Sequence, residues 1–240
     1  MHLLGRRPEF AALDEAAADA APERGGPVVV LHGPAGVGKS ALAVSWLRER
    51  TDRFPDGLLY ADLRGHAPGG PADPAEALGG FLRALGRRTV PADLAEVSAL
   101  WRSTAAPLRL AVLLDGAASA AQVRPLLAGA AHTVTVVTSR TRLTGLALDG
   151  ARLHGVGLLD ADHATAVLAQ RVGAERMAAE PRAAAAVVEH CAGLPLALCV
   201  AGARIAARPR HPLSATAEAL RREADRLAAL RLDGDAATAV

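Results

Sequence analysis

The chain has 240 residues, of which 51% are hydrophobic but only 2% aromatic, and its formal net charge is +2. This length allows one large domain or two smaller ones, and an aromatic-poor composition rich in alanine and leucine favours helices with aliphatic cores. The arginines are interspersed with acids and form no basic stripe, which argues against direct nucleic-acid binding by this segment. No signal peptide and no apolar run of about 18 residues is present, so we expect a cytoplasmic protein that does not span a membrane.

Strands and helices alternate in the first part of the chain. A helix with Pro8 in its first turn follows the stretch "LLGRR", and "GGPVVVLHG" is typical of a strand buried on both faces. Further strands are predicted at 56–63, 108–116 and 132–140, and helices at 39–50, 75–86, 94–101 and 119–127. We therefore predict an α/β fold with a parallel sheet flanked by helices, and "GPAGVGKS" between the first of these strands and the helix over 39–50 indicates a P-loop NTPase sheet.

Strand signals end near residue 155. Asp160 is a predicted N-cap for a helix over 161–173, and three more helices are expected at 181–193, 194–208 and 212–232. The predicted organisation is a P-loop domain over 1–155, a small all-helical domain of about four elements over 156–232, and a tail over 233–240. Cys191 and Cys199 match no metal-binding spacing and are expected to be small buried hydrophobes.

The stretch "HGPAGVGKSAL" fits a phosphate-binding loop. Gly33, Gly36 and Gly38 allow the backbone to curl so that its N–H groups point inward at phosphate oxygens. Lys39 would bridge the β- and γ-phosphates, and the Ser40 hydroxyl would complete the shell of a Mg²⁺ ion. A glycine-rich turn without a ligand is the alternative interpretation.

Lys39 is the only lysine of the chain. Every other permanently charged cationic side chain is an arginine. A compact ammonium on a flexible stem fits between phosphate oxygens better than a planar guanidinium does, which favours the nucleotide site over the empty turn.

Asp115 ends the buried stretch "LAVLLD", where an acid usually holds Mg²⁺. A helix N-cap role for Asp115 is the alternative. The predicted catalytic residues are Lys39, Asp115 and Arg140, and the predicted metal ligands are Ser40 and Asp115.

Other classes of P-loop protein find less support. A GTPase would carry a guanine-reading NKxD element, which the single lysine excludes. A small-molecule kinase would carry a lid rich in arginine, whereas the loop over 63–74 contains only Arg64. The eight histidines show no paired ligand spacing; His66 is expected on a loop surface and Trp46 in the core.

Five motifs occur in an order that resembles the NB-ARC family, the STAND-class nucleotide switches. They are "LLGRRPEFAAL", "GPAGVGKS", "LLDGAAS", "TVTVVTSR" and "GLPLAL". The segments "FPDGLLYADLRG" and "AEALGGFLRALG" look similar to the actinobacterial branch, found in SARP-type transcriptional regulators and proteins with tetratricopeptide repeats. The resemblance implies ADP or ATP with Mg²⁺ as ligands.

Carried over to this sequence, the resemblance places Arg6 near the adenine, Arg140 at the γ-phosphate as a sensor, and Pro195 against the adenine ring. A surface arginine and a simple helix-start proline are the alternatives for the last two. The implied nucleotide-binding residues are Arg6, Gly33, Gly36, Val37, Gly38, Lys39, Ser40, Ala41 and Pro195.

Two departures from the family bear on function. Gly116 stands where many relatives carry a second acid that orients water, so we expect at most a slow P-loop ATPase. The family's winged-helix domain and the effector or repeat domains are absent from these residues, and the tail over 233–240 would be the start of the former. The resemblance implies a regulatory switch controlled by adenine nucleotide, and leaves an oligomer open in the ATP state. Two other hypotheses remain open. One is a catalytic ATPase or phosphotransferase with steady turnover, and the other is an interaction module with a vestigial P-loop.

Overall fold

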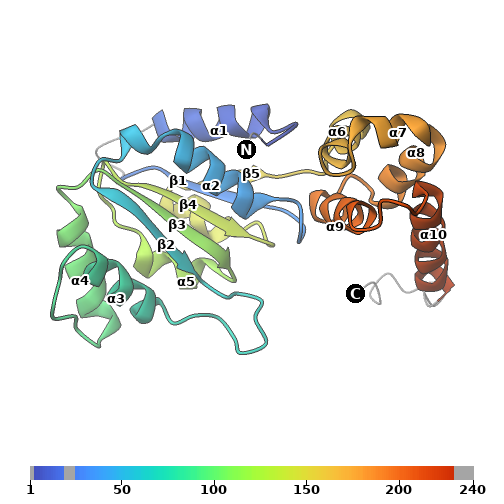
Figure 1. Cartoon of the computed structure of the whole chain (residues 1–240). Coiled ribbons are helices and arrows are strands. Elements are labelled where there is room, and N and C mark those ends of the chain that lie inside the picture. The colour runs from blue at the N-terminus through green and yellow to red at the C-terminus, as the bar shows by residue number, and fades with distance from the viewer. Residues whose placement is uncertain (1–2, 19–24, 230–240) are drawn as a thin grey trace. The chain divides into compact units, whose positions relative to one another are not determined.

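The chain divides into two compact units, one ending at Gly157 and the other beginning at Leu158. The computed structural model describes residues 3–18 and 25–229 (Figure 1). We call the unit that ends at Gly157 the sheet unit and the other the helical unit. The division lies two residues from the predicted boundary, and the predicted tail over 233–240 falls outside the described residues.

Five strands form one sheet in the order β2-β3-β4-β1-β5, and every pair of neighbours is parallel (Figure 1). This confirms the predicted α/β fold with a parallel sheet. The strands are β1 (Val28–His32), β2 (Gly57–Asp62), β3 (Leu110–Ala117), β4 (Val134–Ser139) and β5 (Arg152–Gly155). The sequence analysis missed β5, a four-residue edge strand without β-branched residues.

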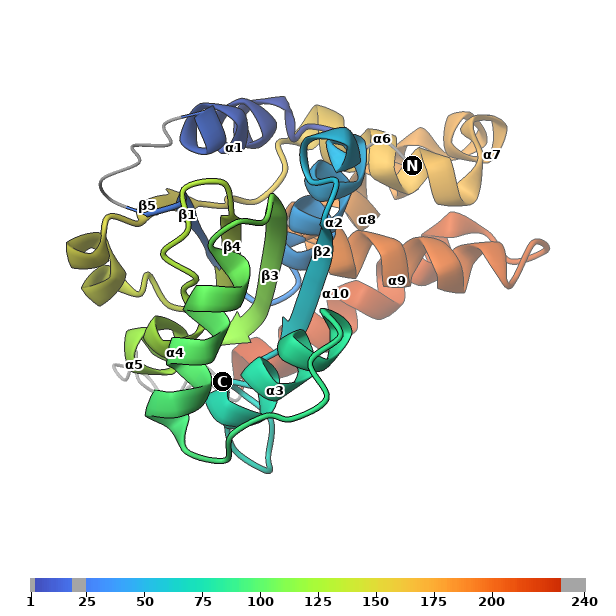
Figure 2. The same ribbon diagram turned by 90° about the vertical axis from the view of Figure 1, so that its left-hand side faces the viewer.

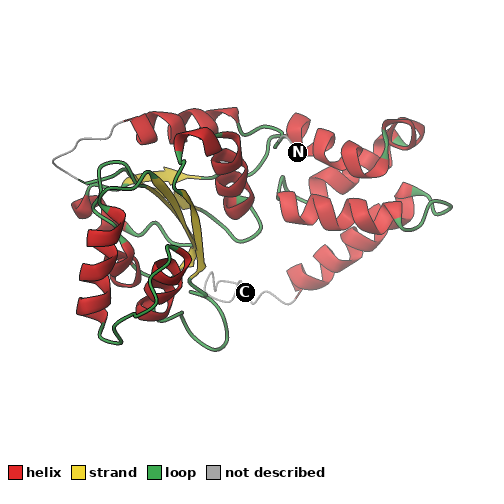
Figure 3. Cartoon of the chain, turned by 60° about the vertical axis from the view of Figure 1, so that its left-hand side comes forward, coloured by secondary structure: helices red, strands yellow, loops and turns green. Residues whose placement is uncertain are grey.

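Helices cover both faces of the sheet, as parallel sheets require (Figures 1 and 3). On one face lie α1 (Arg7–Ala18) and α2 (Lys39–Glu49). Figure 2 shows that α3 (Pro74–Ala84) and α4 (Leu94–Ala105) cover the opposite face beside β2 and β3. Short helices complete this unit: η2 (Thr51–Arg53), α5 (Ala120–Val123), η3 (Arg124–Leu126) and η4 (Thr144–Asp149).

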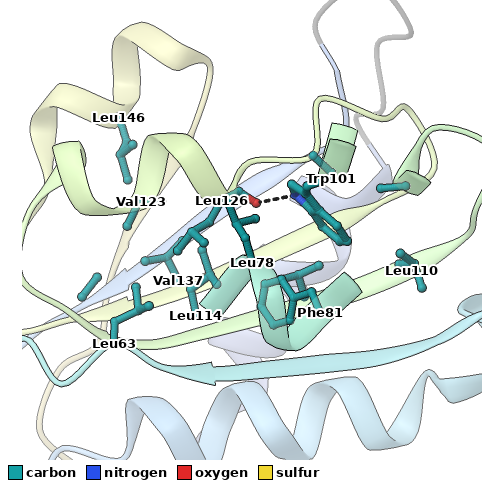
Figure 4. Close-up of a cluster of buried hydrophobic side chains, with 14 of the residues drawn as sticks. Leu63, Leu78, Phe81, Trp101, Leu110, Leu114, Val123, Leu126, Val137 and Leu146 are labelled. Carbon is teal, nitrogen blue, oxygen red and sulfur yellow. Dashed lines mark hydrogen bonds between the residues drawn. The ribbon is translucent and has the colours of Figure 1, made fainter. Parts of the chain in front are cut away.

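The core beneath α3 and α4 is built around two aromatic side chains (Figure 4). The rings of Phe81 and Trp101 pack with their centroids 5.4 Å apart. Trp101 is fully buried, and its Nε1 donates a hydrogen bond to the carbonyl of Leu126 at 3.0 Å, which satisfies the one polar group of the indole. Trp46 on α2 is also fully buried, as predicted.

The helical unit contains five described helices: α6 (Ala161–Val172), α7 (Ala174–Ala179), α8 (Pro181–His190), α9 (Pro195–Ala206) and α10 (Leu213–Ala229). The sequence analysis expected about four, because it missed the six-residue α7. Asp160 caps α6 as predicted, with its carboxylate accepting from the backbone N–H of His163. Cys191 is buried as expected, but Cys199 is only half-buried, since α9 turns part of its surface to solvent.

Candidate nucleotide-binding site

The loop between β1 and α2 has a backbone that only glycine adopts readily. Gly36 and Gly38 have φ angles of 76° and 97°, in the left-handed region. Gly33 has no room for a side chain, because a Cβ there would lie 2.5 Å from the carbonyl oxygen of Val156. The loop leads directly into α2, which begins at Lys39, and the N-terminus of a helix is a suitable place for an anion such as phosphate. The predicted members Val37 and Ala41 lie in the loop and in the first turn of α2.

The Lys39 side chain folds back over this loop. It is 9% exposed, and its Nζ donates hydrogen bonds to the carbonyl oxygens of Gly33 and Pro34, both at 2.8 Å. Burial lowers the pKa of Lys39, and the positive charge of Arg140 lowers it further, while Asp115 acts in the opposite direction. The ammonium is therefore held by loop carbonyls within the electrostatic reach of both Arg140 and Asp115.

A second group of polar atoms gathers around the Asp115 carboxylate on β3. The Ser40 hydroxyl donates to Oδ1 of Asp115 at 2.6 Å, and the Thr138 hydroxyl donates to the same oxygen. Because Mg²⁺ prefers one or two carboxylates, hydroxyl oxygens and phosphate, Ser40 and Asp115 fit the ion they are predicted to hold. The helix that follows is capped by Ser119, so Asp115 is not its N-cap. The sequence analysis missed Thr138, whose signal was its place near the end of the neighbouring strand.

Arg140 is the first residue after β4, and its side chain is exposed. Its positive charge contributes to the lowered pKa of Lys39. Its assignment as a γ-phosphate sensor stays a prediction.

His32 directly precedes the loop and is half-buried. Burial lowers the pKa of His32, and the neighbouring Arg142, His154 and Lys39 lower it further. The lowered pKa favours the neutral imidazole, and the permanent positive charge beside the loop comes from lysine and arginine.

The guanidinium of Arg6 is 5% exposed and is held by protein atoms. It donates to Oε1 of Glu9 at 2.7 Å, to the carbonyl of Gly157 at 2.9 Å and to the carbonyl of Val37 at 3.0 Å. Arg6 thus connects the N-terminal segment to the phosphate loop through its hydrogen bond to Val37. Its contact with adenine stays a prediction. Glu9, which the sequence analysis missed, is signalled by its i,i+3 spacing from Arg6.

The remaining predicted positions lie elsewhere. Pro195 is the first residue of α9 in the helical unit, and its contact with adenine stays a prediction. His66 is exposed in the loop after β2, as expected. Within residues 3–18 and 25–229, no three His, Cys, Asp or Glu side chains come together as a metal site, and no helix has the length and apolarity to cross a bilayer.

Known proteins that resemble this chain indicate its family. A family profile described as an AAA ATPase domain matches residues 2–238. The chain is 42% identical over 229 residues to the regulatory protein AfsR of Streptomyces coelicolor and 44% identical over 202 residues to that of Streptomyces griseus. These matches cover 95% and 83% of this chain but only 23% and 20% of the relatives.

A solved structure from Pyrococcus horikoshii is similar in fold. It is a signal transduction ATPase with numerous domains (STAND) that carries a tetratricopeptide repeat sensor. The TM-score is 0.54 at 20% identity, covering 81% of this chain and 29% of the other. At this identity the likeness concerns the fold alone.

Proposed function

We propose that this chain, which belongs to the family of AAA ATPase domains, is an adenine-nucleotide switch within a larger regulator. ADP would maintain a resting state, and exchange for ATP would activate it. The name of the Streptomyces relatives, "Regulatory protein AfsR", supports a regulatory role, and the chain matches only 23% and 20% of their lengths. The winged-helix, effector and repeat domains, and an oligomer formed with ATP, belong to the same proposal.

The observation that carries this proposal is the Ser40–Asp115 pair beside the glycine loop, with hydroxyl and carboxylate oxygens 2.6 Å apart. Both residues can turn these oxygens toward one cation, and the Lys39 ammonium can exchange the carbonyls of Gly33 and Pro34 for phosphate oxygens. Bound Mg²⁺ would neutralise phosphate charge at this place.

Discrimination between ADP and ATP requires a group that contacts only the γ-phosphate, because a ligand shifts an equilibrium only by its differential affinity. Arg140 is suited to this task, since an exposed guanidinium at a strand's carboxyl end can bind a terminal phosphate with two hydrogen bonds.

Lys39→Ala tests the site. We expect affinity for both ADP and ATP to fall by about 100-fold or more, because a charge-assisted contact to phosphate is lost. Isothermal titration with Mg²⁺ present measures both constants. Arg48→Ala, an exposed cation in the last turn of the same helix, is the matched control and should bind like the unaltered chain. Equal affinities for Lys39→Ala and the unaltered chain would refute the site.

A further inference from the structure

Gly116 has no carboxylate to orient a water molecule, but the carboxylate of Asp62 lies beside it. β2 and β3 are paired in register, with Asp62 opposite Asp115, so the two carboxylates extend from the same face of the sheet. A Cβ built on Gly116 would lie 3.6 Å from Oδ1 of Asp62. An oxygen of Asp62 therefore lies within van der Waals distance of the point where a side chain at residue 116 would begin.

Backbone hydrogen bonds hold Asp62 in this position. The N–H of Leu63 donates to the carbonyl of Asp115 at 2.7 Å, and the N–H of Gly65 donates to that of Gly116 at 2.8 Å. The N–H of Arg64 donates to Oδ1 of Asp62 at 2.9 Å, which orients the carboxylate. The segment after β2 is thus tied to the end of β3, and a carboxylate fixed in this way needs little reorganisation before it acts.

We infer that Asp62 supplies the water-orienting carboxylate that residue 116 does not provide, so that the proposed switch can hydrolyse its ATP and return to the ADP state. The inference rests on the proposed function. Asp62 would accept a proton from a water molecule whose oxygen bonds to the γ-phosphorus. The bond from that phosphorus to the β–γ bridging oxygen breaks, its electron pair stays on ADP, and the proton leaves with phosphate or solvent.

Asp62→Asn tests this role. The side-chain oxygen of asparagine can still accept the hydrogen bond from the Arg64 N–H, so the local fold is preserved. Asparagine cannot accept a proton from water, so the general base is lost. In single-turnover hydrolysis of γ-labelled ATP with Mg²⁺, we expect the rate constant to fall by about 100-fold or more, within the range typical of general-base catalysis. The dissociation constants of ATP and ADP should change by less than about threefold. Asp52→Asn, an exposed acid on η2, should leave rate and affinity unchanged.

A binding measurement separates this role from metal coordination. The dependence of ATP affinity on Mg²⁺, measured against EDTA, should be retained in Asp62→Asn and reduced in Asp115→Asn. A wild-type hydrolysis rate in Asp62→Asn would overturn the inference, as would a loss of Mg²⁺ dependence like that of Asp115→Asn. Absence of phosphate release from unaltered protein that has ATP bound would also overturn it. Failure of the proposed function would appear differently, as unaltered protein that binds neither nucleotide.

Discussion

The two units of this chain differ in the residue types that form their hydrophobic cores. All six aromatic residues occur before residue 158, and Phe81 and Trp101 form the centre of the core beneath α3 and α4. Residues 158–240 contain no Phe, Tyr or Trp, and the helical unit packs with leucine, valine and alanine. The intrinsic tryptophan fluorescence of this protein therefore reports on the sheet unit alone, whereas helical circular dichroism reports on both.

The units also use their polar side chains differently. In the sheet unit, Lys39, Ser40 and Asp115 gather at the carboxyl edge of the strands. In the helical unit, polar side chains bind the backbone at helix ends. Arg176 donates to one carbonyl in the last turn of α9 and to two carbonyls after it, and Glu180 accepts from the first N–H groups of α10. Substitutions at the sheet edge should therefore change ligand affinity, and those at the helix ends should change stability.

The largest effect is expected from Trp101→Ala. Removing this buried indole should destabilise the sheet unit by about 3–5 kcal/mol, because a large cavity remains. Urea unfolding followed by Trp46 fluorescence measures the loss. Trp101→Phe keeps a ring but leaves the Leu126 carbonyl without its donor, so an intermediate loss is expected. If the whole helical circular dichroism signal is lost in one transition that coincides with the fluorescence change, the units do not unfold separately and the comparison fails.

Leu168→Ala should act in the other unit. Leu168 is fully buried on α6, and its truncation should cost about 2–5 kcal/mol. Circular dichroism should detect an earlier helical transition while tryptophan fluorescence keeps its midpoint. Leu196→Ala, at an exposed position of α9, is the matched control and should change stability by less than about 0.5 kcal/mol. A fluorescence midpoint that falls together with the helical signal would contradict independent units.

Arg140→Ala should affect ligand affinity without lowering stability. We expect affinity for ATP to fall about tenfold, equivalent to about 1.4 kcal/mol, because only ATP offers the γ-phosphate. Titration of both nucleotides measures the ratio, and Arg102→Ala, an exposed cation on α4, provides the control. Equal losses for ADP and ATP would show that Arg140 does not distinguish them.

The smallest effect is expected from Glu180→Gln, and it depends on pH. Hydrogen bonds from the backbone N–H groups of Leu213 and Ser214 hold the pKa of Glu180 below its ordinary value of 4.5. A lowered pKa in the folded state means that this carboxylate stabilises the fold fully above pH 4.5 and that its contribution is lost as pH falls through the lowered value. Glutamine cannot titrate, so the variant should lose less thermal stability than the unaltered chain on acidification.

The midpoint of helical circular dichroism, measured at neutral and acidic pH, checks this expectation. At neutral pH the variant should unfold about 3 °C lower. Glu189→Gln, exposed near the end of α8, is the matched control. Parallel pH profiles for Glu180→Gln and the unaltered chain would contradict the capping role.

Much of the fold could be predicted from local pattern, because long apolar runs and glycine turns carry strong signals. The β-branched run of β1 and the position of Asp115 after the apolar run of β3 indicated both the sheet and its functional edge. β5 was missed because its stability comes from pairing with β1, a long-range contact that the sequence "RLHG" does not reveal. The six-residue α7 carries too short a pattern to be distinguished from a loop.

Site residues whose contacts depend on strand pairing or on distant backbone carbonyls were harder to find from the sequence. Thr138 was missed because its hydroxyl reaches Asp115 only through the pairing of β3 with β4. The guanidinium of Arg6 is held by hydrogen bonds to the carbonyls of Val37 and Gly157, which are far away in sequence. Asp62 ends β2, but its place beside Gly116 on β3 follows only from the strand order.

The most direct test of the central claim is to heat-denature the purified protein and identify the released nucleotide by ion-exchange chromatography. We predict ADP in nearly stoichiometric amount, since a resting switch retains it. A protein that releases no nucleotide and takes up neither ADP nor ATP when these are added with Mg²⁺ would contradict the account.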